Sequence, residues 1–383
     1  MSNSDKIFTS SFISVMLINF FTFFSFQMIF PTLPLYIHSL GGGDAVVGLV
    51  MGLFTVTSLL TRPFAGVALD MLGRRRVFLF GLCVLALTAF SYSFATAIVM
   101  IALVRLLHGI GWGIAGTSSA TIAADLLPKK RLGEGIGYFA LANSLSMAIA
   151  PAAGLYLARR YGYSDEFKIA GFLVLISIFL ALVIKYKPYK PHPAALKEGL
   201  YERSAFGPSF MVFCTSSTFS GIASFLPLYA AGQNIHNIGW FFTVYAGAIF
   251  ISRLLTGKIV DRYGYSIVLI PGFLALIAAL LIISRAHDME MFMVSAVVFG
   301  LGFGITQMTL QTMVVRNVPS TRLGAANATF YSGVDMGNGL GALTLGSLAE
   351  LVGYADMFAC SALIIVAALS VYVLYLRPRI AFA

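Results

Sequence analysis

Charged side chains are scarce in this chain of 383 residues. Asp, Glu, Lys and Arg together make up 10% of it, against about 25% in an ordinary soluble domain. Hydrophobic residues make up 59%, and the mean hydropathy is +0.89. A soluble protein of this size could not cover its surface with so few polar groups. The composition therefore excludes an ordinary soluble domain and favours a protein that lies in lipid.

Cysteines and catalytic motifs are also scarce. The three cysteines, Cys83, Cys214 and Cys360, lie in apolar runs, and their placement suits neither a disulfide framework nor a metal site. The sequence contains no Gly-x4-Gly-Lys-Ser/Thr phosphate loop and no Gly-x-Ser-x-Gly elbow. We therefore expect no enzyme activity, no ATP hydrolysis through such a loop, no cofactor and no bound metal.

The apolar runs that are present have the length of membrane-spanning helices. They reach about 20 residues, which a helix needs to cross ~30 Å of hydrocarbon. Strands of a membrane barrel would instead show about 10 residues of strict alternation. We therefore expect an all-α membrane protein. Its twelve transmembrane helices are predicted at residues 12–38, 46–69, 77–95, 98–125, 134–158, 167–186, 208–231, 239–260, 266–285, 290–315, 323–350 and 356–376.

The two halves of the sequence repeat each other at an offset of 191 residues. The offset pairs Arg62 with Arg253 and Asp70 with Asp261, and it also pairs many glycines. Duplicated halves are typical of transporters whose site lies between the repeats. We therefore expect two pseudo-symmetric six-helix bundles, one over residues 1–186 and one over 208–383, joined by a cytoplasmic linker over 187–207.

The basic residues predict the orientation. With the N-terminus inside, the inner segments carry 18 Lys and Arg and the outer segments carry 4. Basic residues concentrate in cytoplasmic loops. We therefore expect both termini in the cytoplasm and the chain in a bacterial plasma membrane. The net charge of +10 then reflects topology, with no nucleic acid as a partner. The expected partners are a small-molecule substrate, protons and lipid, for a monomeric protein.

The loop between the second and third spans carries a charge motif. It reads Gly66-x3-Asp70-x2-Gly73-Arg74-Arg75-Arg76, and a weaker copy follows the eighth span. An acid at a helix end beside arginines can form ion pairs that hold two helices together. A basic loop can also reflect only the excess of basic residues in cytoplasmic loops. We expect a cytoplasmic gating cluster made of Gly66, Asp70, Gly73, Arg74, Arg75, Asp125, Asp261 and Arg262.

This motif and the repeat resemble the major facilitator superfamily along essentially the whole chain. Pro31-x-x-Pro34 and Arg105-x3-Gly109 resemble its twelve-spanning drug:proton antiporter branch. The antiporter motif of the fifth span is degraded, because Leu155 stands where a glycine is expected. Small residues persist there, and we expect helix packing at Gly137, Ala150, Pro151 and Gly154.

Ionisable residues deep in the spans are candidates for proton coupling. Asp335 lies 12 residues into the eleventh span, and Arg105 lies seven residues into the fourth, with His108 almost one turn further. Such residues are costly in lipid and commonly functional. The resemblance implies a role for Arg105 in proton transfer. The alternatives are a structural Arg105, a structural ion pair of Asp335 with Arg105 or another basic group, and a core histidine at 108.

Neutral polar residues within the spans predict a substrate cavity, although serines and threonines in helices often bond their own backbone. We expect a proton-driven exporter of a small amphipathic or hydrophobic compound that works by alternating access. The alternatives are uptake of a sugar or organic anion, export of a lipid-linked sugar or metallophore, and a membrane-embedded enzyme or sensor. The expected cavity residues are Gln27, Asn19, Asn143, Gln307, Gln311, Asn327, Tyr331 and Asn338.

Overall fold

The computed structural model describes residues 6–186, 199–235 and 238–377, and in these ranges it contains helices and no strand. Residues 187–198 of the expected linker lie outside the described residues, and Arg203–Ala205 form a single 3-10 turn that leads into α7. The helices are α1 Ser10–Ser39, α2 Asp44–Leu72, α3 Arg74–Ser91, α4 Ile98–Leu126, α5 Leu132–Tyr161, α6 Tyr163–Val183, α7 Phe206–Gly232, α8 Gly239–Tyr263, α9 Ser266–Arg285, α10 Met289–Arg316 and α11 Leu323–Val371.

The helix α11 contains two membrane crossings. Its 49 residues would be about 74 Å long as one straight helix, more than twice the ~30 Å of hydrocarbon. Gly353 interrupts it with φ 82° and ψ 165°, which is not helical. The ten other helices are each long and apolar enough to cross a membrane. In the part of the chain that is described, the twelve predicted spans are therefore confirmed.

The chain divides into two compact units. The first unit comprises Met1–Pro128, Phe139–Glu202 and Val318–Thr329, and the second comprises Lys129–Tyr138, Arg203–Asn317 and Phe330–Ala383. The offset of 191 residues maps 129–138 onto 320–329. The start of α5 thus belongs to the unit built mostly from the second half of the sequence, and the start of α11 belongs to the other one.

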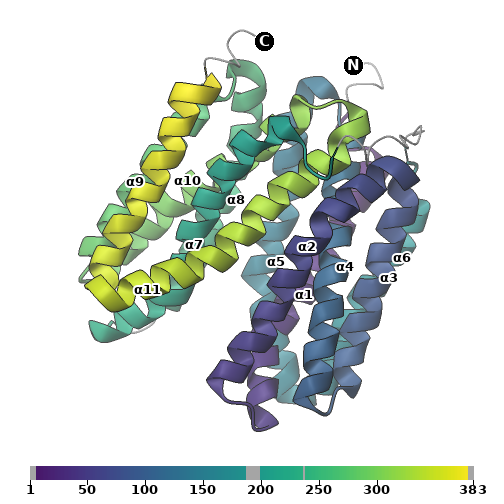
Figure 1. Ribbon diagram of the computed structural model, residues 1–383, viewed down its shortest axis with the longest axis horizontal. Coiled ribbons are helices and arrows are strands. Elements are labelled where there is room, and N and C mark those ends of the chain that lie inside the picture. The colour runs from purple at the N-terminus through teal and green to yellow at the C-terminus, as the bar shows by residue number, and fades with distance from the viewer. Residues whose placement is uncertain (1–5, 187–198, 236–237, 378–383) are drawn as a thin grey trace. The chain divides into compact units, whose positions relative to one another are not determined.

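Glycines bring pairs of helices into close contact within each unit. A Cβ atom on Gly109 of α4 would lie 2.5 Å from the Phe54 carbonyl oxygen of α2. At the repeat-related place, a Cβ on Gly300 of α10 would lie 2.7 Å from the Tyr245 carbonyl oxygen of α8. Small residues at such spacing let helix backbones approach closely in membranes. Figure 1 shows α2 beside α4 in the first unit.

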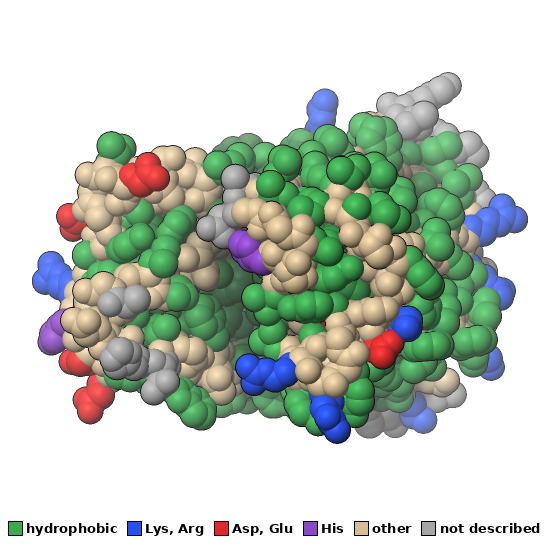
Figure 2. All heavy atoms as spheres, turned by 90° about the horizontal axis from the view of Figure 1, so that it is seen from below, with side chains coloured by type: hydrophobic (Ala, Val, Ile, Leu, Met, Phe, Trp, Pro, Cys, Tyr) green, Lys and Arg blue, Asp and Glu red, His purple; other side chains and the backbone are tan. Residues whose placement is uncertain are grey.

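Large apolar side chains cover the outer faces of the helices. Phe80, Phe179 and Leu343 are each at least 60% exposed. Figure 2 shows hydrophobic side chains over most of the visible surface and few charged ones. Since lipid is the solvent that suits such a surface, the chain is an integral membrane protein.

Gly353 provides a test of the turn that separates the last two spans. Its φ and ψ angles lie in a region that essentially only glycine adopts, and other residues there cost about 1–3 kcal/mol. We expect Gly353→Ala, and Gly162→Ala at the repeat-related turn (φ 89°, ψ 160°), to lower the melting temperature in detergent. Gly247→Ala is the matched control, because open space surrounds that helical glycine. Equal melting temperatures for all three variants would contradict this account.

Candidate functional site

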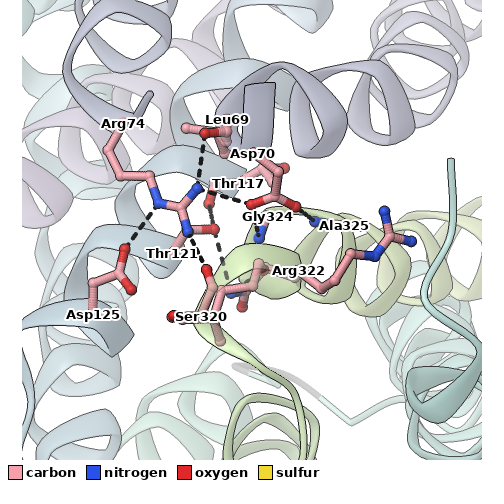
Figure 3. Close-up of polar contacts among 12 residues, drawn as sticks. Leu69, Asp70, Arg74, Thr117, Thr121, Asp125, Ser320, Arg322, Gly324 and Ala325 are labelled. Carbon is pink, nitrogen blue, oxygen red and sulfur yellow. Dashed lines mark hydrogen bonds and ion pairs between the residues drawn. The ribbon is translucent and has the colours of Figure 1, made fainter. Parts of the chain in front are cut away.

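A buried carboxylate caps the start of α11. Asp70, at the end of α2, is 0% exposed. Its Oδ1 accepts the N–H of Gly324 at 3.1 Å, and its Oδ2 accepts the N–H of Ala325 at 3.0 Å. The first N–H groups of a helix have no partner within the helix, and they attract negative charge. We call this arrangement the α11 cap; it lies within the first unit (Figure 3).

Arg74 ties the α11 cap to α4 and to the turn before α11. Its guanidinium Nη1 donates to Asp70 Oδ1 at 2.8 Å, and its Nε donates to Asp125 Oδ2 at 2.8 Å. Its Nη2 donates to the Ser320 carbonyl oxygen at 2.7 Å (Figure 3). Arg74 is only 5% exposed, and a buried charge is stable when it is paired and hydrogen-bonded. The structure thus brings three expected gating residues together.

A second carboxylate caps the start of α5 in the second unit. Asp261, at the end of α8, accepts the N–H of Gly133 at 3.1 Å and the N–H of Glu134 at 2.9 Å. All three residues lie 191 positions from their counterparts in the α11 cap. Arg316, at the end of α10, pairs with Asp261. We call this arrangement the α5 cap.

The arginine comes from different helices in the two caps. Tyr265 stands at the position related to Arg74, and Arg316 stands at the position related to Asp125. The Arg316 guanidinium lies 5.6 Å from the centre of the Tyr265 ring. Burial raises the pKa of the Tyr265 phenol, and the neighbouring Arg316 partly offsets this rise. In the α11 cap, one arginine thus pairs with two carboxylates, whereas in the α5 cap one arginine pairs with one carboxylate.

Glycines allow both caps to form. A Cβ on Gly66 would lie 2.7 Å from the Gly324 carbonyl oxygen, and a Cβ on Gly257 would lie 2.7 Å from that of Gly133. Gly73 has φ 90° and links α2 to α3. The expected gating residues Arg75 and Arg262 are exposed and join neither cap. Arg262 instead lies over the ring of Tyr263.

Further polar contacts hold the start of α11. Arg322 pairs with Glu202 at 3.1 Å, a contact that the sequence does not reveal. Asn327 is fully buried and donates to Thr121 Oγ1 at 3.3 Å. Asn327 belongs to the first unit, whereas Asp335, further along α11, belongs to the second.

The remaining cavity candidates make contacts within single units. In the first unit, Asn19 donates to Asn143 Oδ1 at 2.5 Å, while Gln27 is half-buried. In the second unit, Gln311 donates to the Tyr331 hydroxyl at 3.0 Å. Asp335 is half-buried. Also in the second unit, Gln307 donates to Ser216 at 3.2 Å and to Thr215 at 3.4 Å, and Ser220 donates to the Asn338 carbonyl oxygen at 2.6 Å.

The expected packing residues of α5 lie against other helices. A Cβ on Gly154 would lie 2.5 Å from the Met28 carbonyl oxygen of α1. A Cβ on Gly137 would lie 2.9 Å from the Arg253 carbonyl oxygen of α8. Ala150 is fully buried, and Pro151 lies inside the helix. Close approach at these positions depends on small side chains.

Four rings form an aromatic cluster in the first unit. The centre of the Phe26 ring lies 5.0 Å from that of Phe54 and 4.4 Å from that of Trp112. The His108 ring lies 5.4 Å from the Phe54 ring. Phe54 and His108 are buried, whereas Phe26 and Trp112 are half-buried. This first aromatic cluster therefore presents two rings of α1 and α4 at its margin.

The second unit repeats this cluster. The ring of Phe219 lies 5.5 Å from that of Tyr245 and 5.2 Å from that of Phe303, and Phe299 lies 5.9 Å from Tyr245. Tyr245, Phe299 and Phe303 stand 191 positions after Phe54, His108 and Trp112, and Phe219 stands 193 after Phe26. Again two rings are buried and two are half-buried. We call these four rings the second aromatic cluster.

Arg105 distinguishes the first aromatic cluster from the second. Its side chain is 0% exposed, and its guanidinium carbon lies 4.5 Å from the centre of the Phe54 ring. Nη2 contacts Met51 Sδ at 3.5 Å, while Nε and Nη1 have no hydrogen-bond partner in the structure. Among the described residues of the first unit, no carboxylate forms an ion pair with Arg105. Ala296 occupies the repeat-related position.

Two other buried polar groups lie in the first unit. His108 Nδ1 lies 3.1 Å from the Tyr92 hydroxyl, in a core that also contains Arg105. Glu166, on α6, is fully buried and accepts a hydrogen bond from the Thr32 hydroxyl at 3.2 Å. The sequence singles out Asp335 as the deep acid and gives no sign that Glu166 is the more buried of the two.

The caps can be tested one at a time by hydrogen exchange. In Asp70→Asn, the amide NH₂ would face one of the two helix N–H groups, so a charge-assisted hydrogen bond worth about 1.5–3 kcal/mol is lost. We expect exchange to become roughly tenfold to a hundredfold faster at Gly324 and Ala325 and to stay unchanged at Gly133 and Glu134. Asp261→Asn is the matched control, with the reverse pattern. Unchanged exchange at both helix starts in both variants would contradict the capping role.

Known proteins match almost the whole chain. The Major Facilitator Superfamily model matches residues 15–234 and residues 208–381. The staphylopine export protein of Staphylococcus aureus is 22% identical over 367 residues, which cover 91% of this chain and 91% of that protein. The multidrug resistance protein MdtG of Citrobacter koseri is 26% identical over 364 residues, covering 90% and 89%. The crystal structure of the human organic anion transporter MFSD10 has a TM-score of 0.84 at 17% identity and covers 94% and 98%.

These likenesses agree with the geometry. The family model matches the chain twice, over residues 15–234 and 208–381, which agrees with the repeat seen in the caps and aromatic clusters. The relatives and the structural neighbours are transporters, which excludes the alternative of a membrane-embedded enzyme. The chain therefore belongs to the major facilitator superfamily, whose fold of two pseudo-symmetric six-helix bundles it shares.

Proposed function

We propose that this transporter exports a small amphipathic or hydrophobic compound in exchange for protons. The observation that carries the proposal is the pair of repeat-related aromatic clusters. Each unit holds two buried rings that support two half-buried ones, at Phe26 and Trp112 in the first and at Phe219 and Phe303 in the second. Aromatic rings offer large contact area to apolar ligands of many shapes.

The direction of transport is supported by the named functions of relatives. The staphylopine export protein and the multidrug resistance protein MdtG both align over about nine-tenths of this chain. Both names describe proteins that remove compounds or confer resistance to them. Export is therefore the direction that we propose here.

We propose that proton coupling occurs at positions where the two halves of the repeat carry residues of different chemistry. Asp335 is related by the offset to Ser144, and Arg105 is related to Ala296. A site that couples two different fluxes needs groups that are present in one half only. Asp335 would carry the proton, and the Arg105 charge lies beside the first aromatic cluster. Coupling then follows from different affinities of the two conformational states for substrate and proton.

The two caps would give those states their stability. In each cap, a carboxylate accepts hydrogen bonds from the backbone N–H groups at the start of a helix. The remainder of that helix belongs to the other unit. A cap that forms in one state and breaks in the other would bias the cycle by its free energy. The α11 cap, with two carboxylates on one arginine, would be the stronger of the two.

A second candidate function is the transport of an organic anion. The Arg105 guanidinium is buried with two nitrogens unpartnered and with no ion-paired carboxylate among the described residues. Such a cation would favour a ligand that brings its own negative charge. The proposed export of an amphipathic or hydrophobic compound does not require this property.

Flux in proteoliposomes separates export from uptake. A panel of fluorescent amphipathic dyes, cationic, neutral and anionic, is presented outside vesicles whose interior is acid or alkaline. Antiport predicts accumulation when the interior is acid, whereas symport predicts accumulation when it is alkaline. Accumulation only in alkaline vesicles would overturn the proposed exchange, and transport restricted to anionic dyes would favour the second candidate.

The aromatic clusters are tested with ring deletions in the same vesicles. We expect Phe26→Ala and Phe219→Ala each to raise the KM for the best dye by about tenfold, because each ring contributes about 0.5–1.5 kcal/mol beyond its buried area. Phe179→Ala, on the exposed face of α6, is the control and should leave KM unchanged. An unchanged KM in both cluster variants would exclude these rings from the substrate site.

The coupling residue is tested by removing its charge. Asp335→Asn should leave dye binding measurable but abolish the dependence of uptake on the pH gradient. Glu166→Gln is the control, because it removes a buried carboxylate of the first unit, whereas Asp335 belongs to the second unit. Full gradient-driven uptake by Asp335→Asn, with loss in Glu166→Gln, would transfer the role to Glu166.

A further inference from the structure

An apolar groove of about 410 Å³ lies between α2 and α3 in the first unit. Its volume falls in the range of about 300–1,000 Å³ that ligand pockets occupy. Phe64 and Leu72 of α2 and Phe80 of α3 line it, and each is more than half exposed. Ile114 of α4 forms part of its lining. The groove opens on a surface that is otherwise suited to lipid.

Small side chains on α2 create the groove. Ala65 and Ala68 leave room between the larger residues on either side of them. Beneath them, Ile114 packs with Ala65, Leu69 and Val77 in a buried cluster, which gives the groove a firm base. The shape is therefore a property of the packed helices and not of a loose loop.

One cationic side chain ends the groove. Arg76, in the first turn of α3, is the charged residue of its lining, and it is exposed. Among the described residues, no carboxylate pairs with Arg76, whereas its neighbour Arg74 is committed to the α11 cap. An apolar channel that ends at an available guanidinium matches a ligand with a hydrocarbon chain and an anionic head.

The related positions of the second unit lack this combination. Ile259 replaces Ala68, Tyr263 replaces Leu72 and Ile267 replaces Arg76 at the offset of 191 residues. The fold thus accommodates bulky, uncharged side chains at these positions. The small and basic residues of the first unit are therefore a property of this site and not a requirement of the helix packing.

We propose that this groove binds one acyl chain of an anionic phospholipid whose headgroup phosphate lies on Arg76. The topology expected from the basic residues puts this end at the cytoplasmic leaflet, where anionic lipids attract Lys and Arg. The site is independent of the proposed substrate and of the coupling residues. An occupied groove would brace the Gly73 turn, which positions Asp70 and Arg74 in the α11 cap.

Native mass spectrometry of the intact protein tests this site. The protein is purified in detergent and mixed with phosphatidylglycerol and phosphatidylcholine of the same acyl chains in equal amounts. We expect the wild type to retain one phosphatidylglycerol in preference, and Arg76→Ile to reduce that preference about fivefold, since a basic residue at the surface contributes about that factor. Arg75→Ile, which removes the neighbouring exposed charge, is the control and should keep the preference.

A second variant separates the groove from the charge. Ala68→Ile introduces the residue that the second unit carries, and it should reduce retention of both lipids while Arg76 is intact. Circular dichroism and melting temperature confirm that each variant is folded. The proposal is overturned if Arg76→Ile and Arg75→Ile retain the two lipids in the same ratio, or if Ala68→Ile retains both as the wild type does. It is also overturned if a transported dye displaces the retained lipid equally well from the wild type and from Arg76→Ile.

Discussion

The start of a helix leaves backbone N–H groups without partners, and in an apolar protein such groups must be satisfied from elsewhere. Here a carboxylate from a distant helix satisfies them twice, as Asp70 does for α11 and Asp261 for α5. Because the carboxylates are themselves charged and poorly exposed, each needs an arginine, and Arg74 and Arg316 supply it. The two caps thus share the geometry of carboxylate and helix start, while the arginine comes from α3 in one and from α10 in the other.

The rest of the molecule likewise combines features that both halves share with features that only one half carries. The aromatic clusters match ring for ring across the repeat, and Phe299 stands at the position related to His108. The glycines that bring α4 onto α2 and α10 onto α8 match as well. Arg105, Asp335 and the groove at Arg76 have no counterpart of the same chemistry. Features of the fold are thus shared by the two halves, whereas the features proposed for coupling and lipid binding belong to one half.

Much of the fold could be predicted from the sequence, because the length of an apolar run is a local property. The 191-residue offset also pointed to Asp70 and Asp261. Their partners could not be predicted, since Gly324 lies 254 residues from Asp70 and donates through its backbone. The offset could have revealed Arg316 from Asp125 and the second aromatic cluster from the first, had it been applied to every residue type. The burial of Glu166 and its contact with Thr32 depend on packing that no local pattern reports.

The central claim is that substrate and proton movements are coupled in opposite directions through a carboxylate present in one half only. When one carrier exchanges substrate for protons, a substrate gradient drives protons just as a proton gradient drives substrate. The direct measurement uses vesicles loaded with a pH-sensitive dye at equal pH inside and outside, to which substrate is added externally. The account predicts that the interior of wild-type vesicles becomes alkaline and that Asp335→Asn vesicles show no change. An interior that becomes acid, or an Asp335→Asn response equal to that of the wild type, would contradict it.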